Sequence, residues 1–174
     1  LGFPFCRGRI MDHTEEDVGQ YDKPAEVFWA TGAALCVRRE AYLRAGGLDE
    51  AFFAHMEEID LCWRLKNNGW KLAVVPSSQV WHLGGGSLPM NHPKKLFLNY
   101  RNNLLMLYKN LERKTGKRVL FVRFWLDCLA MAVFFVKGEF ANAKSVCRAY
   151  RDYFKMRKNY TPAADCHQLS GVYK

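Results

Sequence analysis

Several features that mark common protein classes are missing from this sequence. No Walker, dinucleotide-binding, RNP, KH or helix-turn-helix pattern appears, and no internal repeat or low-complexity segment is present. The six cysteines include no CxxC pair, which argues against a zinc site and against a disulfide framework. Cys36 and Cys62 stand in apolar stretches, so we expect buried, reduced thiols in a cytosolic protein.

The chain also lacks an initiating Met and a signal-type segment, since it begins Leu-Gly-Phe-Pro, and we expect it to be part of a longer polypeptide. Its 174 residues, 49% of them hydrophobic, suffice for one domain with a real core. Charge divides it in two. Residues 1–93 carry 9 Lys and Arg against 12 Asp and Glu, whereas residues 94–160 carry 16 against 4. We therefore expect a catalytic or binding part over 1–93 and an extension over 94–174 that attracts anions, either nucleic acid or phospholipid headgroups.

Hydrophobic periodicity and glycine positions predict an α/β fold followed by helices. The expected elements are a surface loop over residues 1–27, strands over 33–37 and 71–76, an extended piece over 78–86, and helices over 38–45, 57–69, 94–116 and 139–160.

The most apolar run, residues 119–136, is about long enough to span a membrane, but Arg123 and Asp127 interrupt it at a spacing that allows them to pair. Two central charges favour an interfacial or re-entrant helix over a true span. Packing of this helix on the same domain, or on a partner chain, is an equally supported alternative.

Three acids crowd together in "FFAHMEEIDLCWRL", residues 52–65. Acids in the first turn of a helix complement its dipole by about 0.3–1 kcal/mol each, which would be reason enough for them. Asp60 can also pair with Arg64 at i+4, which leaves Glu58 without an obvious partner. A carboxylate held at a helix start beside an ion pair is suited to act as a general base.

A second candidate feature is "VWHLGGGS", in which His82 ends an extended piece before Gly84-Gly85-Gly86. A lone His is more often a structural hydrogen-bonding residue than a ligand, and GGGS by itself is weak as a phosphate loop. Taken with the acids of the preceding helix, the segment suggests metal-assisted chemistry at a phosphate.

The run "TGAALCVRREAYLRAGGLDEAFFAHMEEIDLCWRLKNNGWKLAVVPSSQVWHLGGGS" resembles the C-terminal half of the catalytic domain of family 2 glycosyltransferases, which have the GT-A fold. The likeness covers about residues 27–111 and is strongest to bacterial rhamnosyltransferase-like enzymes of surface-polysaccharide synthesis. It implies a mixed sheet with flanking helices, a nucleotide-sugar donor and a saccharide or lipid-linked acceptor.

The resemblance also assigns roles to residues. Glu57-Glu58 stands where the family has its Glu-Asp pair, so Glu58 would deprotonate the acceptor hydroxyl, with Glu57 in support and Asp60 ordering the helix. His82 matches the position that helps to bind the divalent metal on the donor diphosphate. The acceptor side of the cleft would be formed by Trp29, Thr31, Gly32 and Ala33. Arg101, in "NYRNN", would approach the donor phosphates.

From these roles we expect an inverting, Mg²⁺- or Mn²⁺-dependent transfer of a single sugar, since no QxxRW signature of processive synthases follows His82. The nucleotide-binding half, with its Asp-x-Asp metal ligands, would lie before residue 1. The 174-residue chain alone is therefore predicted to be inactive and to hold no metal firmly.

We expect a cytoplasmic location, peripheral to the inner membrane, with an anionic membrane surface and a second copy of the chain as possible contacts. Nucleic-acid binding by the basic helices is the alternative function, disfavoured because those helices have wide apolar faces. An oligomerisation module is a further alternative.

Overall fold

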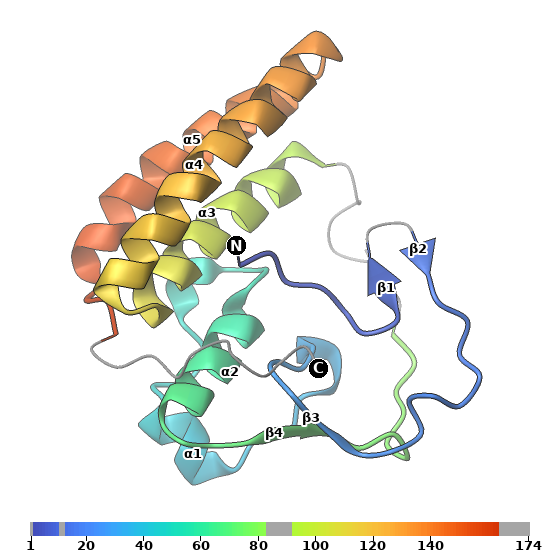
Figure 1. The fold of residues 1–174 in the computed structure, drawn as a ribbon. Coiled ribbons are helices and arrows are strands. Elements are labelled where there is room, and N and C mark those ends of the chain that lie inside the picture. The colour runs from blue at the N-terminus through green and yellow to red at the C-terminus, as the bar shows by residue number, and fades with distance from the viewer. Residues whose placement is uncertain (1, 11–12, 83–91, 164–174) are drawn as a thin grey trace.

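The computed structural model describes residues 2–10, 13–82 and 92–163 (Figure 1). The described elements are β1 Arg9–Ile10, β2 His13–Thr14, β3 Ala25–Val27, η1 Gly32–Ala34, α1 Arg39–Arg44, η2 Glu50–Phe52, α2 Glu57–Asn67, β4 Leu72–Val74, α3 Pro93–Asn110, α4 Arg113–Val136, α5 Phe140–Met156 and η3 Arg157–Asn159. In Figure 1, α3, α4 and α5 pack together at one end, and α1, α2, β3 and β4 lie at the other.

The strands form two short antiparallel pairs rather than an extended mixed sheet within the described residues. β1 pairs with β2 inside the expected N-terminal loop, and β3 pairs with β4 so that Val27 lies opposite Leu72. Leu72 is buried and Val27 packs against the same cluster, so one face of the β3–β4 pair closes over α1 and α2. The α/β character expected from the sequence is confirmed, although the strands are few and short.

Helix α2 is buried on two sides because apolar residues alternate between two of its faces. Ile59 and Trp63, four residues apart, join the core shared with α3 and α5, while Leu61 and Leu65 join the core shared with α1 and β4. Gly69, with φ 81°, follows the end of the helix, and Trp70 N–H returns to Leu65 C=O at 3.0 Å. The helix expected over 57–69 is thus confirmed together with its glycine stop.

Two expectations for residues 33–37 are wrong. These residues form no strand; instead Thr31 caps the short 3-10 helix η1, its Oγ1 accepting from Ala33 N–H at 3.5 Å. The side chain of Thr31 offers the backbone a turn that competes with extended structure. Cys36 is exposed, whereas Cys62 is buried as expected.

The helix predicted over 94–116 ends early, at Asn110. Leu111 and Glu112 take extended backbone, with ψ 144° and 140°, so the chain turns back and α4 begins at Arg113. The turn follows directly on Lys109 and Asn110, whose side chains are bonded to Asp60 of α2. Tertiary contacts therefore end this helix, and Gly116 lies inside α4, where an added Cβ would sit 3.5 Å from Leu111 Cβ.

A buried carboxylate joins the two ends of the molecule. Asp60 is fully buried and accepts from Arg64 Nε at 2.8 Å, from Lys109 Nζ at 3.0 Å and from Asn110 Nδ2 at 2.8 Å. The predicted Asp60–Arg64 pair is confirmed, and Arg64 also donates to the backbone carbonyls of Ala45 and Gly47 after α1.

Lys109 extends this network toward the C-terminal segment. Its Nζ lies 2.6 Å from Asp49 Oδ2, and Tyr160 OH donates to Asp49 Oδ1 at 3.2 Å. Burial opposes ionisation of Asp49, but the hydrogen bond and charge of Lys109 outweigh it and hold the pKa of Asp49 below its usual range. One carboxylate on α2 and one beside η2 therefore share a single lysine of α3.

The apolar run 119–136 lies within α4, and its two charges face inward. Arg123 and Asp127 are both 2% exposed and pair at 3.4 Å, as their spacing predicted. Arg123 also donates to Asn103 at 2.6 Å, and Tyr150 OH donates to Asp127 at 2.8 Å. Within the described part of the chain, α4 is the one helix long and apolar enough to cross a membrane by length and composition, and most of its apolar surface is exposed.

Asp60→Asn should lower the free energy of unfolding by about 3–5 kcal/mol, because Arg64 and Lys109 would lose their shared buried charge. Asp152→Asn is the matched control, since Asp152 pairs with Arg151, whose side chain is 63% exposed. This substitution should change the free energy of unfolding by less than about 1 kcal/mol. Urea unfolding of the chain measures both, and equal effects would contradict a central role for Asp60.

Candidate functional site

The acidic pair follows a strained loop. Three non-glycine residues just before α2 have positive φ: Phe53 at 63°, His55 at 70° and Met56 at 72°. Such conformations cost about 1–3 kcal/mol each and persist only where surrounding contacts impose them. The loop sets the direction in which α2 begins, and thus where Glu57 and Glu58 point.

Helix α3 supplies those contacts. Asn102, fully buried, places Nδ2 within 2.9 Å of Phe52 O, 2.9 Å of Ala54 O and 2.7 Å of His55 O. An amide has two hydrogens, so one of them is shared between two of these carbonyls. Neighbouring Arg101 donates to Ala51 O and Phe52 O at 3.0 and 3.1 Å and to Asn102 Oδ1 at 2.9 Å. Arg101 and Asn102 together form a clamp on the loop.

Glu57 and Glu58 line a groove of about 500 Å³ between η1, α1 and the start of α2. Gly32 lines the same groove, and a methyl group placed on Gly32 would lie 3.8 Å from Glu58 Cβ. Arg39, the first residue of α1, adds a positive charge, and the remaining walls are formed by Leu35, Val37, Tyr42, Leu48 and Leu61. Two carboxylates and one guanidinium are thus among the groups that line the groove.

The environment of Glu58 favours its protonated form. Burial raises the pKa of its carboxyl, and the negative charge of Glu57 raises it further. One oxygen of each carboxylate, Glu57 Oε2 and Glu58 Oε2, is buried without a hydrogen-bond partner in the described part of the chain. Glu58 thus combines a raised pKa with one buried carboxylate oxygen that has no hydrogen-bond partner in the described part of the chain.

The residues expected on the acceptor side lie near this groove to different degrees. Gly32 lines it, Thr31 caps η1 beside it, and Trp29 packs between the two hydrophobic cores. The segment 31–33 is thus shaped by local capping within η1, and its Gly32 lies beside Glu58 of α2. Asp60, also expected among the site residues, points away into the buried network described above.

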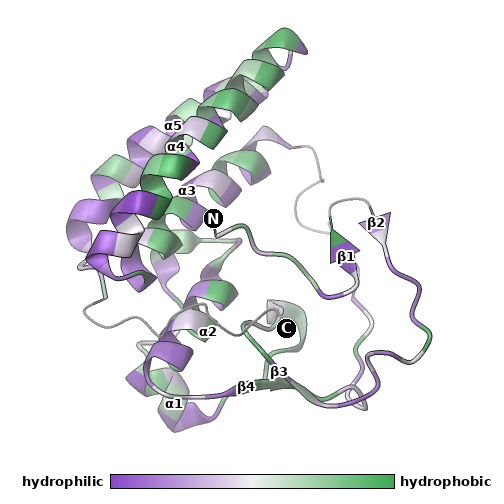
Figure 2. Ribbon diagram, in the orientation of Figure 1, coloured by the Kyte–Doolittle hydropathy of each residue, from purple (hydrophilic) through white to green (hydrophobic). Residues whose placement is uncertain are grey.

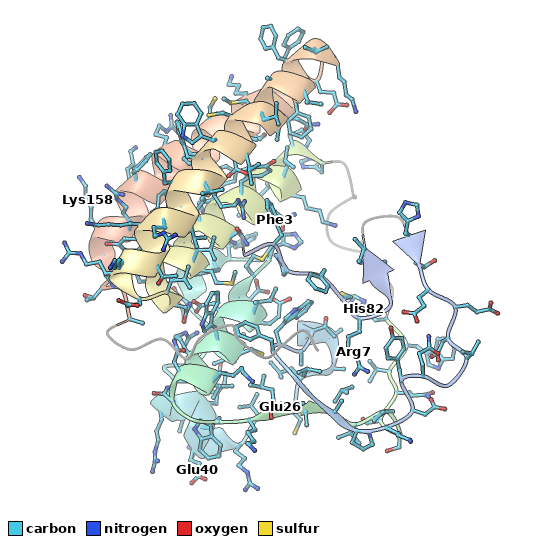
Figure 3. All side chains as sticks on the ribbon, in the orientation of Figure 1. Phe3, Arg7, Glu26, Glu40, His82 and Lys158 are labelled. Carbon is cyan, nitrogen blue, oxygen red and sulfur yellow. The ribbon has the colours of Figure 1, made fainter. Side chains whose placement is uncertain are left out.

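His82 is exposed and does not line the groove of Glu57 and Glu58, and Figure 3 labels it beside Arg7 of the N-terminal segment. The Gly84-Gly85-Gly86 segment lies outside the described residues. Among the residues that the structure describes, no three His, Cys, Asp or Glu side chains gather as a metal-binding set.

The sequence alone did not single out two residues that the structure places at or near the groove, Arg39 and Asn102. In "CVRREAY" no sequence signal distinguishes Arg39 from Arg38. In "NYRNN" the basic Arg101 is the candidate that the sequence offers, and Asn102 follows it without a signal of its own. Arg101 is expected near the donor phosphates, and in this structure its guanidinium donates to the loop carbonyls of Ala51 and Phe52. A buried-side-chain pattern for α3 would have placed Asn102 inward together with Leu98 and Leu105.

Sequence comparisons agree on one family. A profile described as "Glycosyltransferase like family 2" matches residues 10–104, more than half of the chain. The chain is 36% identical over 87 residues to an N-acetylglucosaminyl-diphospho-decaprenol L-rhamnosyltransferase of Mycobacterium tuberculosis, a match that covers 49% of this chain and 28% of the relative.

Two further relatives are also named as glycosyltransferases. Over 90 residues the chain is 31% identical to the rhamnosyltransferase WbbL of Escherichia coli, covering 51% of this chain and 32% of that protein. A pre-mycofactocin glycosyltransferase of M. tuberculosis is 35% identical over 74 residues, covering 40% of this chain and 16% of the relative. The chain thus spans about a third or less of the length of these relatives, and no solved structure matches it.

Asn102→Asp keeps the shape of the side chain but replaces its donors with an acceptor. We expect faster amide hydrogen exchange over residues 53–58 and a loss of about 1–3 kcal/mol in unfolding free energy, because buried carbonyls would lose their donors. Asn142→Asp, which alters a surface bond to Glu139, is the control. Unchanged exchange in the loop would show that the strained backbone holds without the clamp.

Proposed function

Because this chain belongs to glycosyltransferase-like family 2 and is rhamnosyltransferase-like in sequence, we propose that it forms the acceptor and base side of a GT-A glycosyltransferase. The complete protein would move a sugar from a nucleotide-diphosphate donor to an acceptor hydroxyl in polysaccharide synthesis. The observation that carries the proposal is the groove in which Glu57 and Glu58 face Gly32 of the 31–33 segment.

In the proposed reaction Glu58 accepts the proton of the acceptor hydroxyl. The oxygen then attacks the anomeric carbon of the donor sugar, the bond from that carbon to the diphosphate breaks, and the configuration inverts. Inversion needs a single base on the face opposite the leaving group. Burial and the charge of Glu57 raise the proton affinity of Glu58, which strengthens it as a base.

We assign the neighbouring residues to supporting roles. Glu57 tunes Glu58 through its charge, and Asp60 anchors α2 so that the glutamates keep their direction. Thr31, Gly32 and Ala33, with Trp29 behind them, would contact the acceptor, and Arg39 would bind its polar groups. Arg101 supports the site by holding the loop before α2. In the complete protein, Arg101 would also contact the donor diphosphate.

Donor and metal binding belong largely to other parts of the protein in this proposal. The chain matches 28% of the mycobacterial relative, and its described residues hold no complete metal ligand set. Mg²⁺ or Mn²⁺ would neutralise charge on the leaving diphosphate, with His82 as one ligand at most from this chain. The 174 residues alone are therefore proposed to be inactive.

The acceptor is proposed to be a lipid-linked saccharide. The name of the mycobacterial relative contains a diphospho-decaprenol, a lipid-borne diphosphate. Reaction at such an acceptor fits a cytoplasmic enzyme that works at the membrane.

Glu58→Gln, made in the full-length protein, should reduce release of nucleoside diphosphate from a nucleotide-sugar panel by about 10²–10⁴-fold, since Gln keeps the shape but cannot take a proton. Glu40→Gln, an exposed acid on α1, serves as the matched control and should leave the rate unchanged. The assay is run with and without Mn²⁺ and with the 174-residue chain alone. Full activity in Glu58→Gln would remove Glu58 from the mechanism.

The same enzyme should show an acid limb in kcat/KM against pH. The base works only when ionised, so activity should rise with pH through a midpoint above that of an ordinary glutamate, because the pKa of Glu58 is raised. Glu57→Gln removes a like charge and should shift the midpoint to lower pH. A midpoint at or below that of an ordinary glutamate would contradict the assignment of Glu58 as the titrating base.

A further inference from the structure

We propose that the outer stripe of α4, formed by Phe121, Trp125, Leu129, Val133 and Val136, lies on the surface of an anionic lipid bilayer. These side chains repeat every three or four residues, so they follow one line along the helix. Their exposed fractions are 65%, 59%, 63%, 44% and 88%. The inference concerns where the protein works and is independent of glycosyl transfer.

The stripe stays apolar because the charges of α4 point the other way. Arg123 and Asp127 pair on the inner face, where Asn103, Tyr150 and the ring of Phe3 also contact them. No charged side chain therefore interrupts the outer stripe between Phe121 and Val136. Figure 2 shows the result, with hydrophobic colour over the upper, protruding part of α4 and hydrophilic colour at its lower end.

Cations flank the stripe at the lower end. The first turns of α4 expose Arg113, Lys114, Lys117 and Arg118. Beside them opens a hollow of about 890 Å³ between α3, α4 and α5, with aromatic walls that include Phe121 and Phe124. Arg157 and Lys158 of η3 add two more cations to the hollow, and Figure 3 labels Lys158 at this end.

The apolar stripe and the neighbouring cations together indicate which kind of partner binds this face of α4. An aromatic and aliphatic stripe next to a cationic patch matches the acyl boundary and the negative headgroups of a bilayer, and each basic residue near such a surface adds about fivefold in affinity. A nucleic acid would need cations along the stripe itself, where there are none between Phe121 and Val136. Charge complementarity therefore favours anionic lipid as the occupant.

The helix lies along the surface rather than crossing it. α5 packs against α4 and carries exposed cations, among them Lys144, Arg148, Arg151 and Lys155. If α4 spanned the bilayer, these charges would enter the hydrocarbon, which is unfavourable for each of them. With α4 flat on the surface, α5 stays on the side of water and of the proposed active site.

The test is co-sedimentation of the 174-residue chain with vesicles of phosphatidylcholine, alone or mixed with phosphatidylglycerol. Binding should require the anionic lipid and weaken with salt. A triple-serine variant of the stripe should bind the vesicles at least about tenfold more weakly; it carries Phe121→Ser, Trp125→Ser and Leu129→Ser. Ile10→Ser/Val18→Ser/Val80→Ser, which removes equally exposed apolar side chains elsewhere, should not.

Two further measurements identify the face and the charge. Brominated lipid should quench Trp fluorescence in the wild type, and most of that quenching should disappear in Trp125→Phe while binding persists. A double variant at the start of α4, Lys114→Gln with Arg118→Gln, should weaken vesicle binding by about 25-fold. The control double variant, Lys23→Gln with Lys71→Gln, should leave vesicle binding unchanged.

Three results would overturn the proposal: no binding of the folded chain to anionic vesicles, equal binding by the two triple-serine variants, or quenching that is the same in Trp125→Phe. A dimer that the stripe substitutions dissociate, in a chain that ignores vesicles, would assign the stripe to self-association instead. Light scattering on the same samples reports the oligomeric state.

Discussion

The buried carboxylate of Asp60 is the interaction on which the arrangement of this molecule depends. It accepts from Arg64 of its own helix and from Lys109 and Asn110 of α3, and it is fully buried. A charge in such a place is tolerated only when its partners are complete. The cost of leaving it unpaired fixes α2 against α3, and through Arg64 it also fixes the turn after α1.

With α2 placed in this way, α3 can act on the loop that precedes it. Asn102 holds three carbonyls of a segment whose backbone would relax if it were free. The strain and the clamp balance one another, so the glutamates that follow are aimed by residues some fifty positions away in sequence. The groove chemistry therefore depends on α3 as much as on the helix that bears the acids.

The sequence predicted those features that depend on local pattern. The ends of α1 and α2 follow from Gly46 and Gly69, the Asp60–Arg64 pair from i+4 spacing, and the inward Arg123–Asp127 pair from the same rule. The family was recognisable from the order of its motifs, and the profile match confirms it.

The features that failed depend on contacts between distant residues. Thr31 turns the chain where apolar residues suggested a strand, and α3 ends at Asn110 because that side chain bonds α2. Periodicity carries no sign of such partners. For the same reason the groove could be anticipated at Glu57 and Glu58, whereas Arg39 and Asn102 could be found only once α1 and α3 had been placed in space.

The inward pair on α4 has a consequence for the helix before the bundle has formed. Before α5 packs on α4, Arg123 and Asp127 lack the cover of Tyr150. Two charges near the middle of a helix raise the free energy of insertion by the translocon by about 5–7 kcal/mol. The pair therefore disfavours insertion of α4 across a bilayer for as long as α5 does not cover it.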